Sequence, residues 1–170
     1  MRKTEKILKI LILTAILTSF LLISGCSQKE NNTKAFLEYF YTFDRQNEAA
    51  FFERFDNAED FEEMVILLSE KYEPMMSLTS DYGIDILKKN RFPIGLWKFL
   101  YDNDMDMSIK NIDMTQIKDN SFDFSVTIDI NRENETLYSG VQEGSIILDK
   151  NNKVDKTYFQ NVKEIWEIRK

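Results

Sequence analysis

The strict alternation of apolar and polar side chains between residues 122 and 130 is the feature that most constrains the fold. Its apolar members occupy every second position: Phe122, Phe124, Val126, Ile128 and Ile130. Because successive side chains of a strand point to opposite faces, the pattern predicts a β-strand with one buried and one solvated face. Such a strand belongs in an antiparallel sheet that is covered on one side.

The segment before this strand predicts another one that contains an irregularity. Met107 and Ile109 share one parity, whereas Ile112 and Met114 share the other. A strand can keep both pairs on one face only if it contains an extra residue. The change of parity therefore predicts a β-bulge near Lys110.

The segments after residue 130 predict the rest of the sheet. After a short turn we expect a strand over 135–148, bent or bulged at Gly140 or Gly144. A polar hairpin loop at 149–153 follows. The stretch 154–168 then closes the sheet, although its end also suits a helix.

The chain before the sheet has helical periodicity instead. We expect helices over 33–44, 48–55, 58–73 and 80–90, whereas 96–101 suits either a helical turn or an extended segment. Apolar residues form one stripe along the third helix: Phe61, Met64, Val65, Leu68 and Tyr72. We interpret this stripe and the other phenylalanines as core, and we expect Pro74 to end the helix.

The order of these elements defines the fold class. Helices followed by an antiparallel meander of about four strands predict an α+β fold, with the N-terminal helices packed on a curved sheet. We find no internal repeat, and we expect residues 33–170 to form a single domain.

The N-terminus carries the sequence pattern of an export signal. Four basic residues precede an uncharged run over 10–25 that is too short to span a bilayer comfortably: Arg2, Lys3, Lys6 and Lys9. We interpret 1–25 as a signal peptide and the polar stretch 26–32 as a tether. Since Cys26 is the only cysteine, the chain cannot form an intramolecular disulfide.

The end of this leader, Ile23-Ser24-Gly25-Cys26, resembles the lipobox of bacterial lipoproteins. The resemblance implies cleavage between Gly25 and Cys26 and lipid attachment to Cys26, whose amine is then open to acylation. It places the protein on the extracytoplasmic face of the cell membrane, held there by its lipid. The alternative is an uncleaved signal anchor with an incidental cysteine. The frequent Ile, Lys and Asn residues are typical of an AT-rich, Gram-positive genome.

Charge and composition exclude several classes of function. The chain carries 22 basic and 29 acidic side chains, and removal of residues 1–25 would leave 18 and 28, a net charge of −10. An acidic surface repels phosphate backbones, so we expect no nucleic-acid partner. Without histidine, no Ser-His-Asp triad or His/Cys zinc site can form, and we expect no cofactor.

The element order also resembles the NTF2-like (cystatin-like) fold over residues 33–168. The resemblance rests on N-terminal helices, a helix-to-sheet transition at Asn90-Arg91, and long bent strands joined by hairpin loops. It implies a curved sheet around a helix, with a cavity at the mouth of the cone, and in many members a homodimer through the open sheet face. The fold hosts enzymes and interaction modules alike, so it does not decide function.

Three aspartates require a test as a metal site. Asp102, Asp104 and Asp106, with Asp113, partly match a calcium-binding loop. The pattern places Met107 where such a loop requires glycine, so we interpret the segment as an acidic loop that leads into a strand.

Two functions remain open. The first is a non-catalytic binding or interaction module that uses the cone mouth or sheet face for a protein, a peptide or a small apolar ligand. The second is a cavity enzyme that uses a carboxylate and a tyrosine, but no spacing singles out a pair among the candidates: Asp44, Asp81, Asp85, Tyr39, Tyr41 and Tyr82. Arg91 could bind a ligand carboxylate, pair with a nearby acid or cap the preceding helix.

Overall fold

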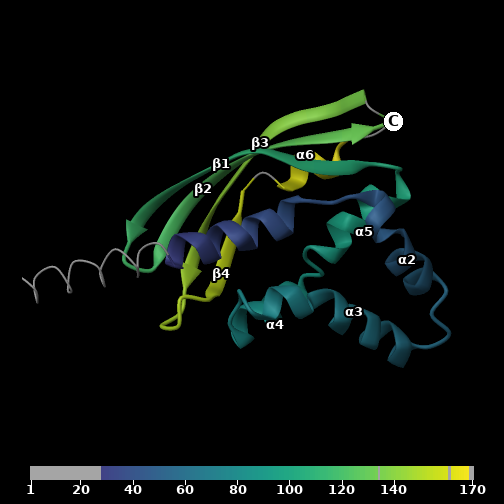
Figure 1. The fold of residues 1–170 in the computed structure, drawn as a ribbon, viewed down its shortest axis with the longest axis horizontal. Helices are drawn as coiled ribbons and strands as arrows, with labels where there is room; N and C mark the ends of the chain where they lie inside the picture. Colours follow the sequence, from purple (N-terminus) through teal and green to yellow (C-terminus); the bar gives the residue numbers. More distant parts are fainter. Residues whose placement is uncertain (1–27, 134, 161, 169–170) are drawn as a thin grey trace, which may run out of the picture.

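A computed structural model describes residues 28–133, 135–160 and 162–168. The α+β fold predicted from the sequence is confirmed: five N-terminal helices pack on a four-strand antiparallel sheet (Figure 1). The helices cover residues 28–41, α2 (Arg45–Asp56), α3 (Phe61–Met76), α4 (Asp81–Lys89), α5 (Ile94–Asp102) and α6 (Val162–Trp166). The strands are β1 (Asp106–Lys118), β2 (Ser121–Arg132), β3 (Glu135–Leu148) and β4 (Val154–Phe159).

The strands form a simple meander in the order β1-β2-β3-β4. The alternating apolar residues of β2 are buried, as the sequence predicted, and they face the helices. The expected bulge is also confirmed, because the register of β1 against β2 shifts between Ile109 and Asn111. As a result Met107, Ile109, Ile112 and Met114 all lie opposite buried residues of β2.

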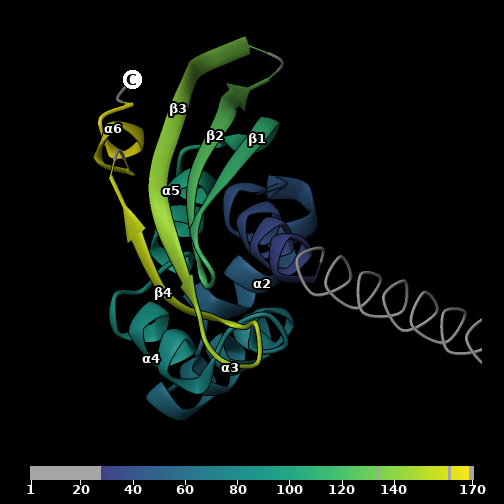
Figure 2. The same cartoon turned by 90° about the vertical axis from the view of Figure 1, so that its left-hand side faces the viewer.

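The N-terminal helix lies in the hollow of the curved sheet (Figures 1 and 2). Its apolar stripe is fully buried, with no exposed surface on Phe36, Leu37, Phe40 or Tyr41. The ring of Phe159 on β4 stacks on Phe40 at 4.5 Å between centroids. This aromatic packing joins the helix to the far edge of the sheet and forms the centre of the core.

Residues 28–32, which the sequence analysis assigned to a tether, are helical and contact the body of the protein. Lys29 donates to the backbone oxygen of Asp119 at 2.8 Å, and Asn32 donates to that of Asn152 at 3.0 Å. These bonds hold the helix against the β1–β2 and β3–β4 turns. This segment is polar because its side chains bind backbone oxygens of two turns and do not pack in the core.

Aspartates cap both α2 and α3. Asp44 caps α2, because its carboxylate accepts from the Asn47 N–H. Asp60 caps α3 by accepting from Glu63 N–H at 2.8 Å. Pro74 lies inside α3 and does not end it, since the helix continues to Met76. A proline removes only one backbone donor, and so near a C-terminus its effect is limited.

Helix α4 lies close to β4. Ser80 caps it, and a side chain at Gly83 would meet the backbone oxygen of Val154 at 2.5 Å, so only glycine permits this approach. The undecided segment 96–101 is helical and belongs to α5.

The structure also decides two expectations about the C-terminal part of the chain: the bend or bulge of the third strand and the nature of the segment 154–168. The register of β3 against β2 is regular at both Gly140 and Gly144, so neither glycine forms a bulge. They leave room instead, because the Tyr138 side chain lies over Gly140 and the Phe124 ring lies over Gly144. The segment 154–168 divides into strand β4 and helix α6, where Trp166 packs against Phe99.

Candidate functional site: an apolar groove with a cationic end

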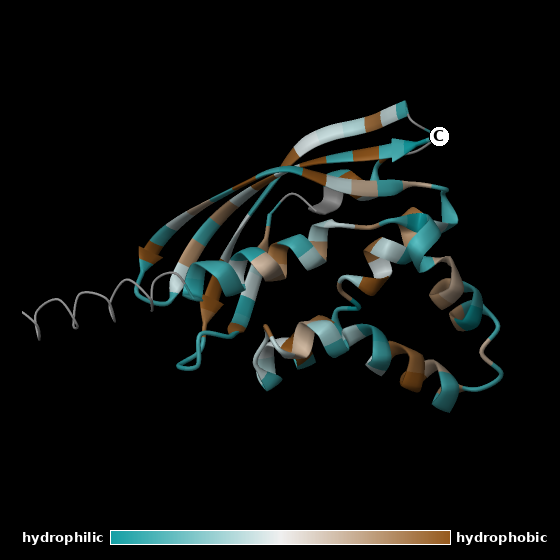
Figure 3. Ribbon diagram, in the orientation of Figure 1, coloured by the Kyte–Doolittle hydropathy of each residue, from teal (hydrophilic) through white to brown (hydrophobic). Residues whose placement is uncertain are grey.

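A groove of about 600 Å³ separates α3 from α5. The α3 wall supplies Phe61, Met64, Val65, Leu68, Ser69 and Tyr72, and Phe55, Lys88, Arg91, Ile94, Gly95 and Lys98 complete the lining. In Figure 3 the hydrophobic segment of α3 lies in the helical layer farthest from the sheet. The size and apolar lining are typical of small-molecule sites.

The α3 stripe was predicted to be core, and that prediction is wrong for its outer part. Phe61 is 78% exposed and Val65 is 42% exposed. All five residues of the stripe line the groove. The buried residues of α3 are Leu67, Tyr72 and Met75, and of these only Tyr72 belongs to the stripe. Helical periodicity marks an apolar face, but it does not show whether another element covers that face.

The two ends of the groove differ in charge. At one end Lys98 forms ion pairs with Asp56, at 3.2 Å, and with Asp102. Burial alone would lower the pKa of Lys98, but its bonds to the two carboxylates raise the pKa above the ordinary value. The cation at this end is therefore neutralised.

At the other end stand Lys88 and Arg91. Within the described residues, neither side chain forms a salt bridge with a carboxylate. The ammonium of Lys88 lies 5.7 Å from the centroid of the Tyr72 ring, which is a cation–π distance. Tyr72 itself donates to the Phe92 backbone oxygen at 2.8 Å, and burial raises its pKa, so its hydroxyl stays neutral.

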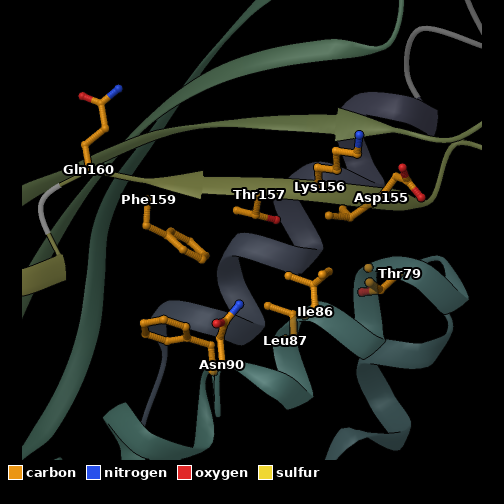
Figure 4. A pocket seen from close by; sticks show the side chains of 12 residues that line it. Thr79, Ile86, Leu87, Asn90, Asp155, Lys156, Thr157, Phe159 and Gln160 are labelled. Carbon is orange, nitrogen blue, oxygen red and sulfur yellow. The ribbon is translucent and has the colours of Figure 1, made fainter.

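A second cavity, of about 360 Å³, lies between α4 and β4 (Figure 4). Ile86 and Leu87 of α4 face Thr157 and Phe159 of β4 across it. Its lining also contains Thr79, whose buried hydroxyl has no partner among the described residues. This cavity is smaller than the groove and mixed in character, and it carries no pair of unneutralised cations at one end.

The resemblance implied a cavity between the N-terminal helix and the sheet, but around Phe159 aromatic side chains fill that space. Phe159 lies within 6.5 Å of the rings of Phe40, Tyr41 and Phe124. The hydroxyl of Tyr41 is buried without a hydrogen-bond partner in the described part of the chain, and burial raises its pKa. Around these rings the space is packed, although Phe159 also lines the second cavity.

The candidate acids and tyrosines of a cavity enzyme do not come together. Asp44 is a helix cap, Asp85 pairs with Lys89, and the Tyr39 hydroxyl donates to the Lys71 backbone oxygen. Asp81 and Tyr82 are exposed near the start of α4. The one tyrosine–carboxylate hydrogen bond in the described residues joins Tyr138 to Glu164, at 3.0 Å, and lies outside both cavities.

The three aspartates weighed as a calcium loop diverge. Asp104 and Asp106 both bind Arg45, through its guanidinium and its backbone N–H, each at 2.7 Å. Asp102 pairs with Lys98 instead. In the ranges that the structure describes, no three acidic or thiol side chains gather closely enough to hold a metal ion. These aspartates tie the start of α2 to the α5–β1 loop.

Gly25 and Cys26, the expected cleavage and lipidation residues, lie outside the described residues, as does the leader. None of the helices in the described ranges has the length and apolarity that a bilayer crossing requires. Comparison with protein-family models, with curated proteins and with solved structures gave no match. The fold class and the groove are therefore the findings on which a function must be argued.

Sequence reasoning identified Arg91 as a candidate ligand for a carboxylate and missed Lys88. The sequence shows only that two basic residues stand three positions apart where the expected helix ends. Because Arg91 lies beyond α4 with a positive φ, helical spacing does not place its side chain, and the pairing with Lys88 is a property of the folded chain. For the third cation, Lys98, the i,i+4 spacing to Asp102 was readable from the sequence, whereas its second partner, Asp56, comes from the end of α2.

Proposed function

We propose that this protein is a lipid-anchored lipoprotein of the outer face of the cell membrane, with an NTF2-like body that acts as a non-catalytic binding module. The anchor rests on the lipobox-like Ile23-Ser24-Gly25-Cys26 after a basic, apolar leader. The family assignment rests on element order, since helices that pack in a curved antiparallel meander are typical of that fold.

The observation that carries the binding role is the uncovered α3 stripe. Single exposed apolar side chains are ordinary, but a contiguous apolar groove with a few charged groups at its edge is typical of a binding site. The groove, and not the filled cone, is the surface we assign to the ligand. Nothing among the described residues favours a catalytic role over binding.

A homodimer through the outer face of the sheet remains a second proposal about partners. That face carries mainly polar residues, such as Asp123, Ser125 and Thr127, with Val141 and Tyr158 as exposed exceptions. Stable homodimer interfaces are usually more apolar than this. Sedimentation of the detergent-extracted protein would reveal a dimer, and a Val141→Asp/Tyr158→Asp variant should then be monomeric if this face is the interface.

Metabolic labelling tests the anchor. Full-length protein is expressed in a lipoprotein-processing bacterium that is fed an alkyne-tagged palmitate. We expect the membrane fraction to contain labelled protein, and a Cys26→Ser variant to be unlabelled and released. Ser24→Ala is the matched control, since it keeps a small residue beside the cut and should remain labelled. An unlabelled wild-type chain that retains Met1 would refute the anchor.

A further inference from the structure

Arg91 occupies a backbone conformation that an arginine rarely adopts. Its φ is +56°, in the left-handed region where glycine is favoured. The backbone ends α4 there, because Arg91 N–H donates to the Lys88 oxygen at 3.1 Å and Phe92 N–H donates to the Leu87 oxygen at 2.9 Å. Glycine would meet this geometry without strain. Asp104, Glu133 and Asn152 also have a positive φ, so it is the place of Arg91 on the groove lining, together with this geometry, that makes its side chain a candidate for a functional role.

The two ends of the groove differ in unneutralised positive charge. Lys88 and Arg91 stand unneutralised at the Tyr72 end, whereas Lys98 at the opposite end is neutralised by Asp56 and Asp102. Between these ends the α3 wall is apolar from Phe61 to Leu68. A ligand that complements this surface has an anionic head at one end and an apolar remainder.

The dimensions favour a narrow ligand. From Phe61 to Tyr72 the axis of α3 rises by about 16 Å, so the groove is long for its volume. An unbranched alkyl chain laid along this wall would contact apolar side chains from Phe61 to Leu68.

We propose that the groove binds a fatty acid. Its carboxylate lies between the guanidinium of Arg91, which can hold it through two parallel hydrogen bonds, and the ammonium of Lys88. Its alkyl chain lies along Phe61, Val65 and Leu68. This inference names the ligand class for the binding role proposed above, and it does not depend on the anchor at Cys26.

Photolabelling tests the proposal in the full-length protein. The cell fraction that holds the protein is incubated briefly with a palmitate that carries a diazirine and an alkyne, irradiated and digested with trypsin. We expect light-dependent label on the peptide 55–71, and we expect excess unlabelled palmitate to remove it. Label on the Cys26 peptide after metabolic feeding is light-independent, so the failure of either proposal is seen separately.

Arg91→Gly is the decisive variant. Glycine relieves the positive φ, so the melting temperature should stay or rise, while light-dependent labelling should fall about tenfold because a charge-assisted bidentate contact is lost. Lys89→Gln, whose lysine pairs with Asp85 outside the groove, is the control and should label like the wild type. Val65→Ser tests the alkyl wall independently and should also lower labelling.

Three results would overturn the proposal. The first is equal labelling of Arg91→Gly and wild type. The second is label spread equally over Ile66 and Met76, which are exposed but outside the groove, because that distribution indicates a surface that dips into lipid. The third is loss of label to a competitor of another class when palmitate itself does not compete. The competitors to compare are a neutral monoacylglycerol, a monoacyl phosphate and an acidic amphipathic peptide, and each would name a different class of ligand for the groove.

Discussion

The N-terminal helix and α3 carry the same kind of sequence pattern and meet opposite environments. Each has aromatic and aliphatic side chains at helical spacing along one face. In the N-terminal helix the face is sealed under the curved sheet, and Phe40 has no exposed surface. In α3 the face borders an open groove, and Phe61 is 78% exposed.

The comparison teaches that amphipathicity and burial are separate properties. The free energy gained from an apolar face depends on the area removed from water, about 25 cal/mol per Å², and so on the element that covers it. The N-terminal helix gains this free energy within the chain. The outer part of the α3 stripe does not, which leaves it available to a ligand.

The largest effect expected is from truncation of the sealed face. Phe40→Ala removes a ring that stacks on Phe36 and Phe159, and it should lower the free energy of unfolding by about 3–5 kcal/mol in urea titrations. Phe61→Ala is the matched change on the open face and should stay within about 0.5 kcal/mol of the wild type. Equal losses at the two sites would remove the distinction between the faces.

Two glycines extend the comparison from side chains to close contacts. A methyl group at Gly144 would lie 2.1 Å from the Tyr158 backbone oxygen and 2.6 Å from the Phe124 ring. Gly144→Ala should therefore destabilise the protein by about 1–3 kcal/mol. At Gly95, on the groove wall, the nearest atoms are 3.9 Å away, so Gly95→Ala should be neutral or stabilising by up to about 1 kcal/mol. Thermal unfolding of the two variants measures the contrast, and a destabilised Gly95→Ala would mean that the groove wall is tightly packed.

The cap of α3 tests how far the open helix depends on its own local interactions. Asp60→Ala removes the carboxylate that accepts from Glu63 N–H and should cost about 1 kcal/mol, seen as a lower melting temperature. Ser69→Ala, an exposed change on the same helix, is the control and should have no such effect. If Asp60→Ala were silent, packing on α2 and α4 would be sufficient to hold α3 in place.

The smallest effect is expected on the solvated face of the sheet. A hydrogen bond from Lys110, at 3.0 Å, and another from Ser139 hold the pKa of Asp129 below its ordinary value. The carboxylate thus stabilises the fold above its unfolded pKa, and this contribution is lost as the pH falls through the lower folded pKa. In Lys110→Met the pKa of Asp129 should rise, as measured by NMR titration, and the difference in stability from wild type should vanish at acidic pH. A difference that persists in acid would have another cause.

The sequence predicted the type of each helix or strand better than it predicted which other element packs against it. The alternation over Phe122–Ile130 gave β2 because a half-buried strand leaves a period-2 pattern whatever covers it. The change of parity around Lys110 located the bulge of β1 for the same reason. The ends of helices were predicted less accurately, since Pro74 was expected to end α3 and the helix continues to Met76.

The groove was beyond prediction from one sequence, for a physical reason. Its stripe on α3 is indistinguishable by spacing from a core stripe, and its opposite wall comes from α5, more than twenty residues further along the chain. Arg91 was singled out by its type, but its left-handed backbone and its distance from any acidic partner are properties of the folded chain. The roles of Asp104 and Asp106 on Arg45 were hidden for the same reason.

The extra residue in β1 changes the parity of the residues that face inward along that strand. On either side of Lys110 the same inward face is supplied by residues of opposite parity, Met107 and Ile109 before it, Ile112 and Met114 after it. Deletion of this one residue would remove the bulge and leave a regularly alternating strand in which Ile112 and Met114 keep the inward face. Lys110 is therefore a position that β1 can lose without turning its later side chains over, whereas loss of a paired residue would move them to the opposite face.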